Sequence, residues 1–219
     1  MCTKVWNKLI AWFDLNGRSF IWRERREPFV VLIAEILLKK TSANVVNQFL
    51  PRFLDRYSDM HALNDSTFED LEEALAPLGL SAQRGKQLKS LAHALVQSYG
   101  GVIPNERDKL LQLPGIGEYT VGAVLSFAYE KPEAMVDTNV ARIIIRFYGI
   151  EPSRYEARRS PEVWERAWRL VSQDSKRSHK INWALLDLGA LICRSRKPKC
   201  DECPLNSNCA FATLQNTHT

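Results

Sequence analysis

Leu113-Pro114-Gly115-Ile116-Gly117 forms a short turn between two helices that the sequence predicts over residues 105–112 and 117–129. Apolar residues recur at intervals of three and four on both sides of this turn, which is typical of amphipathic helices. The two glycines allow a tight turn whose backbone N–H groups face outward at the start of a helix, and such a turn binds anions. A Gly-x-Gly turn on its own is more often a plain connector, so its role depends on the rest of the chain.

The helical pattern continues through the rest of the chain. One face of a first helix contains Trp6, Leu9, Ile10 and Phe13. Pro28 begins an apolar helix that extends to residue 38, and Ser66 and Glu69 have the spacing of a capping box that begins another helix. We predict further helices over residues 43–57, 82–99, 138–148, 160–172 and 180–192. No segment alternates with the two-residue period of a strand, so the predicted fold class is all-α.

The composition indicates a globular protein and excludes a membrane-spanning one. Of the 219 residues, 45% are hydrophobic and 25% are charged, and no run of about 18 apolar residues occurs. The first residues lack the basic and apolar succession of a secretory signal, so we predict a cytoplasmic protein, in the prokaryotic cytosol or nucleoid. A net charge of +5 is compatible with a polyanionic partner but does not identify one.

Four of the five cysteines lie close together near the C-terminal end. They are separated by six, two and five residues, and they are Cys193, Cys200, Cys203 and Cys209. In a compartment that keeps thiols reduced, this spacing favours a metal site over disulfides. Four thiolates hold either zinc or a 4Fe–4S cluster, and the spacing by itself leaves both open.

The loop between the first two of these cysteines is strongly basic. It contains four cations: Arg194, Arg196, Lys197 and Lys199. A bound metal would fix these charges in place, so we predict that they contact DNA phosphates and make binding salt-dependent. The alternative is a solvated basic surface.

Two carboxylates stand out from their surroundings. Asp137 lies in the first turn of the predicted helix 138–148, where the helix dipole favours a negative charge, although the residue can also serve only as an N-cap. Glu35 interrupts the apolar helix that begins at Pro28, where an unpaired carboxylate would be costly. Its alternative role is that of a buried ion-pair partner.

Three features follow one another along the chain: the hairpin turn, the helix that begins with an aspartate and the four-cysteine loop. They occur in the same order in the helix-hairpin-helix DNA glycosylases. The chain resembles this superfamily, which includes endonuclease III, over nearly its whole length. The resemblance implies a 4Fe–4S cluster on the four cysteines. It also implies a helical barrel over residues 24–130, and a second lobe formed by residues 1–23 and 131–219, which includes the cluster loop 193–209. The cleft between the lobes would receive the DNA.

The resemblance also implies roles for individual residues. Gly115 and Gly117 of the hairpin would contact DNA. Asp137 would be the catalytic carboxylate, which stabilises positive charge on the sugar of an extruded nucleotide as the base departs. Glu35 would line the base pocket, and Lys40 would lie beside the gap that the extruded base leaves in the duplex.

Within the superfamily, the chain resembles the G/T-mismatch thymine and uracil glycosylases. Bifunctional members have a lysine where Tyr119 stands, and a phenol cannot form an imine with the sugar, so we expect little or no AP lyase activity. Tyr119 is therefore assigned to the catalytic site, with a core aromatic as the alternative. The turn that contains Gln83 and Arg84 would contact the DNA backbone or the orphan base, although Gln83 can also be a plain turn residue.

We therefore predict a monomeric DNA glycosylase of base excision repair, which acts on double-stranded DNA and hydrolytically removes thymine or uracil mispaired with guanine to leave an abasic site. One alternative is an adenine glycosylase acting on A:G or A:8-oxoguanine pairs. Lys39 and Lys40 stand where those enzymes have two glutamines, and the chain ends ten residues after Cys209 without their further domain, so we expect this alternative less. The other alternative is a non-catalytic binder of damaged DNA.

Overall fold

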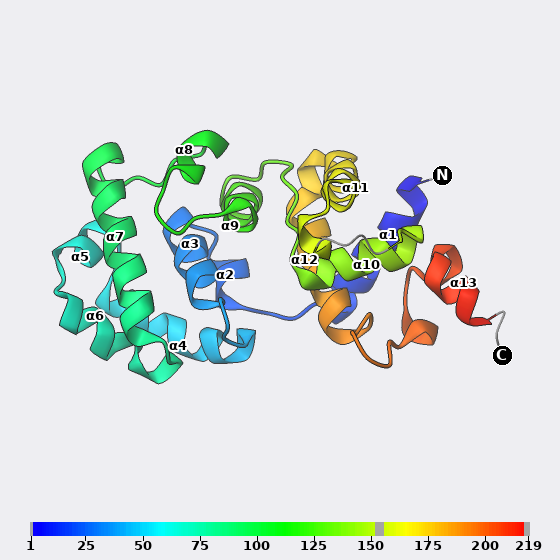
Figure 1. The fold of residues 1–219 in the computed structure, drawn as a ribbon, viewed down its shortest axis with the longest axis horizontal. Helices are drawn as coiled ribbons and strands as arrows, with labels where there is room; N and C mark the ends of the chain where they lie inside the picture. The colour runs from blue at the N-terminus through cyan, green and yellow to red at the C-terminus, as the bar shows by residue number, and fades with distance from the viewer. Residues whose placement is uncertain (1, 152–155, 217–219) are drawn as a thin grey trace. The chain divides into compact units, whose positions relative to one another are not determined.

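The computed structural model describes residues 2–151 and 156–216, and every regular element in this part of the chain is a helix (Figure 1). The predicted all-α fold class is confirmed. The helices form two compact units, which we call the central unit, Ser19–Tyr129, and the terminal unit, made of the described parts of Met1–Arg18 and Glu130–Thr219. The resemblance to the glycosylase superfamily implied divisions after residues 23 and 130 instead. None of the described helices is both long and apolar enough to cross a membrane.

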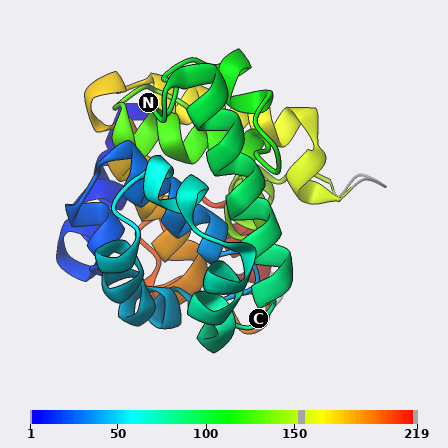
Figure 2. The ribbon, with the colours of Figure 1, turned by 90° about the vertical axis from the view of Figure 1, so that its left-hand side faces the viewer.

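The central unit is built around one largely buried helix, α3, at Pro28–Leu37. Its residues from Val30 to Leu37 are all buried, because the helix is apolar apart from Glu35 and packs against α2, α4, α9 and η2. The long helix α7 packs against α5 and α6 on another side of the unit (Figure 2). The helices around α3 are α2 (Ile21–Glu24), α4 (Ala43–Arg56), α5 (Met60–Asp65), α6 (Phe68–Leu75), η1 (Ala76–Leu78), α7 (Ser81–Tyr99), α8 (Arg107–Leu111), α9 (Glu118–Ala123) and the π-helix η2 (Val124–Ala128).

The capping box that begins α6 lies one residue later than predicted. Thr67, not Ser66, is the N-cap: its hydroxyl oxygen accepts from the backbone N–H of Asp70 at 3.0 Å, and the Asp70 carboxylate accepts from the Thr67 N–H at 3.3 Å. The hydroxyl of Ser66 instead donates to the Leu63 carbonyl at 2.7 Å, at the end of α5. The predicted pair of Ser66 and Glu69 is therefore wrong, because Ser66 belongs to the end of the preceding helix.

The terminal unit has its own core. It consists of α1 (Cys2–Asn16), α10 (Thr138–Tyr148), η3 (Ala157–Arg159), α11 (Pro161–Ser172), η4 (Ser175–Arg177), α12 (Ser178–Leu191), η5 (Cys200–Glu202), η6 (Asn206–Asn208) and α13 (Ala210–Asn216). Helix α12 packs against α1, α10 and α11. Gly189 of α12 allows the close approach to α10, because a Cβ atom there would lie 2.6 Å from the Cβ of Asn139.

One buried ion pair fastens the end of α1 to α12. Asp187 is fully buried, and its carboxylate accepts from the backbone N–H of Arg18 at 2.7 Å and from Arg18 Nε at 2.8 Å. The Arg18 guanidinium also lies 2.7 Å from the same carboxylate through Nη2. The pair therefore joins segments that are 169 positions apart in the sequence.

Candidate active site and cysteine loop

Asp137 begins α10, and hydrogen bonds hold both oxygens of its carboxylate. Oδ1 accepts from the backbone N–H groups of Asn139 at 2.8 Å and Val140 at 2.7 Å, and Oδ2 accepts from Asn139 Nδ2 at 2.9 Å. The side chain is only half-buried. Asp137 is therefore an N-cap, and it also presents a negatively charged group in a fixed position that solvent can reach.

Asn139 and Arg142 connect this carboxylate to the cysteine loop. Arg142 Nη2 donates to Asn139 Oδ1 at 2.8 Å and to the Gly189 carbonyl at 2.9 Å, while its Nε donates to the Cys193 carbonyl at 2.7 Å. Arg142 lies one turn into α10, so the guanidinium spans from the start of this helix to the end of α12. The position of Asp137 is thereby linked to that of the first cysteine.

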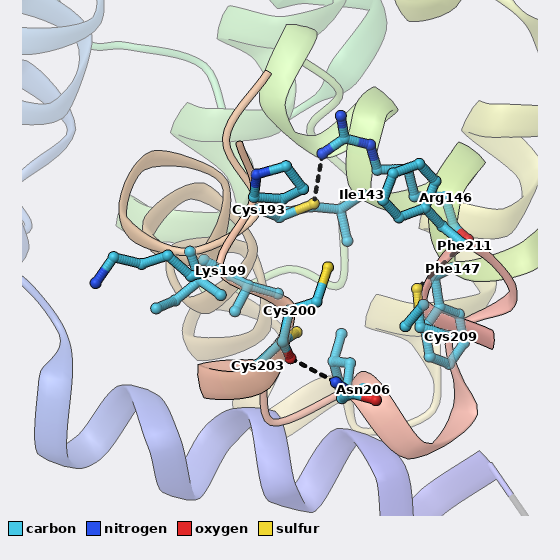
Figure 3. A pocket seen from close by; sticks show the side chains of 15 residues that line it. Ile143, Arg146, Phe147, Cys193, Lys199, Cys200, Cys203, Asn206, Cys209 and Phe211 are labelled. Carbon is cyan, nitrogen blue, oxygen red and sulfur yellow. Dashed lines mark hydrogen bonds between the residues drawn. The ribbon is translucent and has the colours of Figure 1, made fainter. Parts of the chain in front are cut away.

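The four predicted ligand cysteines line one pocket, which the structure forms between α10, the end of α12 and the residues that follow (Figure 3). None of the four is in a disulfide. The pocket holds about 400 Å³ of empty space, part of it open to solvent. Its other walls are mostly apolar and include Ile143, Phe147, Leu188, Ile192 and Leu205.

Arg146 binds the loop at the edge of this pocket. Its Nη1 lies 3.5 Å from Cys193 Sγ and 2.7 Å from the Arg194 carbonyl, and its Nη2 donates to the Ser195 carbonyl at 3.1 Å (Figure 3). The guanidinium also lies over the ring of Phe211 at 4.6 Å. One side chain of α10 thus fixes the loop next to its first cysteine.

The thiols fit a metal centre chemically. Burial raises the pKa of Cys203 to about 11, and burial together with the neighbouring cysteines raises the pKa of Cys200. These sulfurs therefore need a cationic group to become thiolates, and a bound metal centre both supplies that charge and ligates the deprotonated form. Four sulfurs around an apolar-walled space are suited to a cluster of iron and sulfide.

The basic loop presents fewer unpaired cations than its sequence suggests. All four predicted DNA contacts are exposed: Arg194, Arg196, Lys197 and Lys199. Lys199 Nζ, however, lies 2.8 and 2.9 Å from the two carboxylate oxygens of Glu202. The charge of Lys199 is therefore partly neutralised within the loop.

Glu35 and Tyr119, the other two predicted catalytic residues, belong to the central unit, whereas Asp137 belongs to the terminal unit. Glu35 is 4% exposed, on the buried helix α3. Its charge raises the pKa of Lys39, although partial burial of the Lys39 amine has the larger effect and lowers it. Tyr119 lies in the first turn of α9 and is half-buried.

The hairpin turn between α8 and α9 has the shape that its sequence predicts. Gly115 adopts a left-handed conformation, with φ of +74°, and Gly117 is the N-cap of α9. Both glycines are exposed, while Ile116 between them is 8% exposed and anchors the turn. An ion pair of Arg107 with Glu118 joins the two helices. The turn therefore presents its glycine backbone to solvent.

The structure separates the roles of three other residues that were predicted to contact DNA. Lys40 and Gln83 are exposed, as a DNA contact requires. Arg84, in contrast, is 4% exposed and directs its guanidinium inward to the turn that follows α3. The geometry therefore favours a positioning role for Arg84 over the predicted contact with DNA.

Residues 33–169 match the HhH-GPD superfamily of base excision DNA repair proteins, and residues 193–209 match the iron–sulfur binding domain of endonuclease III. The chain belongs to the HhH-GPD superfamily. This confirms the family that the hairpin, Asp137 and the cysteines had indicated. It also identifies DNA as the partner of this chain.

Individual HhH-GPD relatives match along nearly the whole chain. The thymine-DNA glycosylase of Aeropyrum pernix is 37% identical over 93% of this chain and 92% of its own length. The thymine/uracil-DNA glycosylase of Methanothermobacter thermautotrophicus is 36% identical over 93% and 90%. A solved structure of a thermostable thymine-DNA glycosylase has a TM-score of 0.91 and 33% identity, over 97% of this chain and 96% of that one. Adenine DNA glycosylases, such as that of Homo sapiens, are more distant at 32% identity, and this chain covers 38% of its length.

The match of the cysteine loop decides between the two metals that its spacing left open. The loop is an iron–sulfur binding domain, the four thiols share one pocket, and the walls are apolar, so the prediction of a 4Fe–4S cluster is confirmed. Cys193, Cys200, Cys203 and Cys209 are the residues that would hold it.

Sequence reasoning missed Asn139, Arg142 and Arg146. The signal was present, since Arg142 and Arg146 are one helical turn apart on an otherwise amphipathic helix and Asn139 follows the aspartate by two positions. What the sequence did not show is that Arg142 binds the end of α12 and that Arg146 binds the loop that follows it.

Proposed function

We propose that this HhH-GPD protein is a monofunctional DNA glycosylase, which acts as a monomer and removes thymine or uracil mispaired with guanine. The observation that supports it is the Asp137 carboxylate, which hydrogen bonds hold at the start of α10 while leaving it half-exposed. The relatives that match over nearly the whole chain include a thymine-DNA glycosylase and a thymine/uracil-DNA glycosylase, and this supports the choice of base.

The proposed reaction is hydrolysis of the bond between C1′ of deoxyribose and N1 of the pyrimidine. This bond breaks, its electron pair leaves with the base, and the oxygen of water bonds to C1′. The water loses a proton and the base gains one, so no oxidant or reductant is needed. As the bond breaks, positive charge develops on the sugar. A carboxylate that is already fixed in position stabilises this charge without first having to reorganise.

Other residues of the chain bind and position the DNA. The exposed N–H groups of the hairpin turn suit phosphate oxygens, and so do the cations of the cysteine loop. This loop is cross-linked when a 4Fe–4S cluster is bound, so its cations stay in one arrangement. Tyr119 has no amine with which to form an imine, so we propose that the product is an intact strand with an abasic site.

The test is a panel of labelled duplexes that contain T:G, U:G, A:G or A:8-oxoguanine pairs, each assayed with and without alkali. We expect strand breaks only in the T:G and U:G duplexes, and only after alkali has cleaved the abasic site. Release of adenine alone would overturn the choice of base. Breaks of equal intensity without alkali would overturn the assignment of Tyr119 as a residue that prevents lyase activity.

The same panel distinguishes an enzyme from a non-catalytic binder. The Asp137→Asn variant should bind a T:G duplex about as tightly as the wild-type protein but release the base about 100- to 1,000-fold more slowly. If both proteins bind alike and neither releases a base from any duplex, the chain is a binder of damaged DNA and the proposed reaction is wrong.

A further inference from the structure

Three polar side chains join two exposed turns of the central unit through α7. We call residues 38–41 the α3 turn and residues 113–117 the hairpin turn. Arg84 and Gln87 lie three positions apart on α7, and Lys39 lies in the α3 turn. Most of their hydrogen bonds end on backbone carbonyls of the two turns, so they fix the course of the backbone.

Arg84 holds the α3 turn. Its Nη1 donates to the Leu37 carbonyl at 3.1 Å, and its Nη2 donates to the Lys39 carbonyl at 2.8 Å and to Thr41 Oγ1 at 2.7 Å. The last carbonyls of a helix have no partner inside the helix and lie at its negative end, so a buried guanidinium suits them. Lys40 has φ of +58°, which is uncommon for a residue other than glycine. The turn therefore depends on Arg84 for a backbone conformation that its own residues disfavour.

Two side chains hold the hairpin turn through the carbonyl of Gly115. It accepts from Lys39 Nζ at 3.0 Å and from Gln87 Nε2 at 3.2 Å. Gly115 is left-handed, and a Cβ atom there would lie 2.7 Å from Gln87 Nε2, so only glycine allows this approach. Within the described part of the chain, the N–H groups of Gly115 and Gly117 donate to no protein acceptor. The carbonyl is bound inward, and these two donors remain available.

The two neighbouring lysines of the α3 turn therefore differ in role. Lys39 is exposed, but its ammonium is bound to the hairpin turn and lies near the charge of Glu35, two interactions that direct it toward the protein. Lys40 is exposed, and among the described residues it has no partner. Lys40 is thus the lysine that is free for a phosphate or an orphan base.

We propose that Arg84, Gln87 and Lys39 form a positioning network that fixes the α3 turn and the hairpin turn relative to each other before DNA arrives. This inference rests on the proposed function, in which both turns contact DNA. A surface that is already ordered loses less conformational entropy on binding, so the network raises affinity without touching the ligand. It replaces the DNA contact that the sequence predicted for Arg84, and it adds Gln87 and Lys39 to the residues on which binding depends.

The first test needs no DNA. Amide hydrogen exchange of Ile116, whose N–H donates to the Leu113 carbonyl inside the hairpin turn, is measured in Lys39→Met, Gln87→Ala and the double variant. Either donor alone still holds the Gly115 carbonyl, so each single variant should change little. Loss of both should speed exchange about tenfold, since two net hydrogen bonds of this kind are worth roughly that factor. The exposed Gln97→Ala on the same helix is the matched control and should leave exchange unchanged. Unaltered exchange in the double variant would overturn the network.

The second test separates positioning from direct contact. Dissociation constants for a duplex with a tetrahydrofuran abasic-site analogue are measured over a range of salt concentrations. The double variant should bind about tenfold more weakly, with an unchanged slope of log Kd against log salt, whereas Lys40→Met should reduce the slope by about one. If Lys39→Met also reduces the slope by about one, Lys39 is a phosphate contact and the proposal is wrong. If the wild-type protein does not bind the duplex, the proposed function is wrong. The exchange test still shows whether the network orders the hairpin turn.

Discussion

At the level of single residues, Asp137 has two tasks that a substitution can separate. Its carboxylate caps α10 through the backbone N–H groups of Asn139 and Val140, and in the proposed reaction it stabilises charge on the sugar. Asparagine caps a helix about as well as aspartate but has no charge. We therefore expect Asp137→Asn to keep the cap of α10 while losing the hydrogen bond from Asn139 Nδ2, and to lower the single-turnover rate on a T:G duplex about 100- to 1,000-fold, as removal of one preorganised stabilising group does.

Asp137→Ala is the control that removes the cap as well. Loss of an N-cap costs about 1 kcal/mol, so this variant should unfold at a lower urea concentration than the asparagine variant, which keeps the cap. Both variants should release the base slowly in single-turnover assays by quenched flow or manual quenching. An asparagine variant with the wild-type rate would show that the charge of Asp137 is not used in catalysis.

At the level of elements, α10 connects the candidate catalytic carboxylate to the cysteine loop through Arg142. This guanidinium binds Asn139, Gly189 and Cys193, and hydrogen bonds of a charged group contribute about 1.5–3 kcal/mol. We expect Arg142→Met to lose stability in that range. We also expect its 4Fe–4S cluster to lose visible absorbance faster under a chelator, because removing a partner of a metal ligand typically weakens metal binding about 10- to 100-fold.

The comparison for this prediction is Arg169→Met on the exposed face of α11. Among the residues that the structure describes, Arg169 pairs with Glu165 alone, at the surface, where such an ion pair contributes little. It should leave the cluster absorbance, its decay and the urea midpoint as in the wild-type protein. Equal cluster decay in both variants would mean that α10 does not support the loop through Arg142.

The elements that could be predicted are those long enough to show a period. Helices α4, α7, α10, α11 and α12 begin and end within about two residues of the predicted bounds. Helix α5 has six residues, too few for a repeat, and it was not predicted; its closing residue Ser66 was then mistaken for the next cap. The local pattern of apolar residues was therefore enough to predict the fold class. The short helix α5 could not be predicted from it, because tertiary contacts stabilise this helix.

The candidate site divides in the same way. Asp137 and the four cysteines could be predicted because residue type and spacing are enough to indicate their roles. Arg84 could not, because a sequence shows a charge but not the direction in which it points, and an arginine in a polar turn resembles a surface cation. Its three acceptors are more than 40 positions away in the chain.

At the level of the whole chain, the pair of Arg18 and Asp187 holds the N-terminal helix to the C-terminal part of the sequence. Asp187→Ala would leave a guanidinium beside a buried site without its acceptor. Breaking a buried pair in this way costs about 3–5 kcal/mol. We expect that loss in urea unfolding, and we expect the double variant with Arg18→Met to recover part of it, because the uncompensated charge is then gone. A double variant less stable than Asp187→Ala would contradict this account.

The net charge of +5 becomes informative once the paired cations are separated from the others. In the cysteine loop, Lys199 is bound to Glu202, whereas Arg196 and Lys197 are exposed and contact no carboxylate or other acceptor among the described residues. Each phosphate that a cation neutralises adds about 0.9 to the slope of log affinity against log salt. We therefore expect Arg196→Ala and Lys197→Ala each to reduce this slope by about that amount for a T:G duplex, and Lys199→Ala to reduce it by less.

Because the cluster holds the loop, chelation of the iron should reduce the slope of the wild-type protein as well, by more than any single substitution. Fluorescence anisotropy titrations over a range of salt concentrations measure all four. Equal slopes for every variant would mean that the loop is a solvated basic surface and that the DNA lies elsewhere.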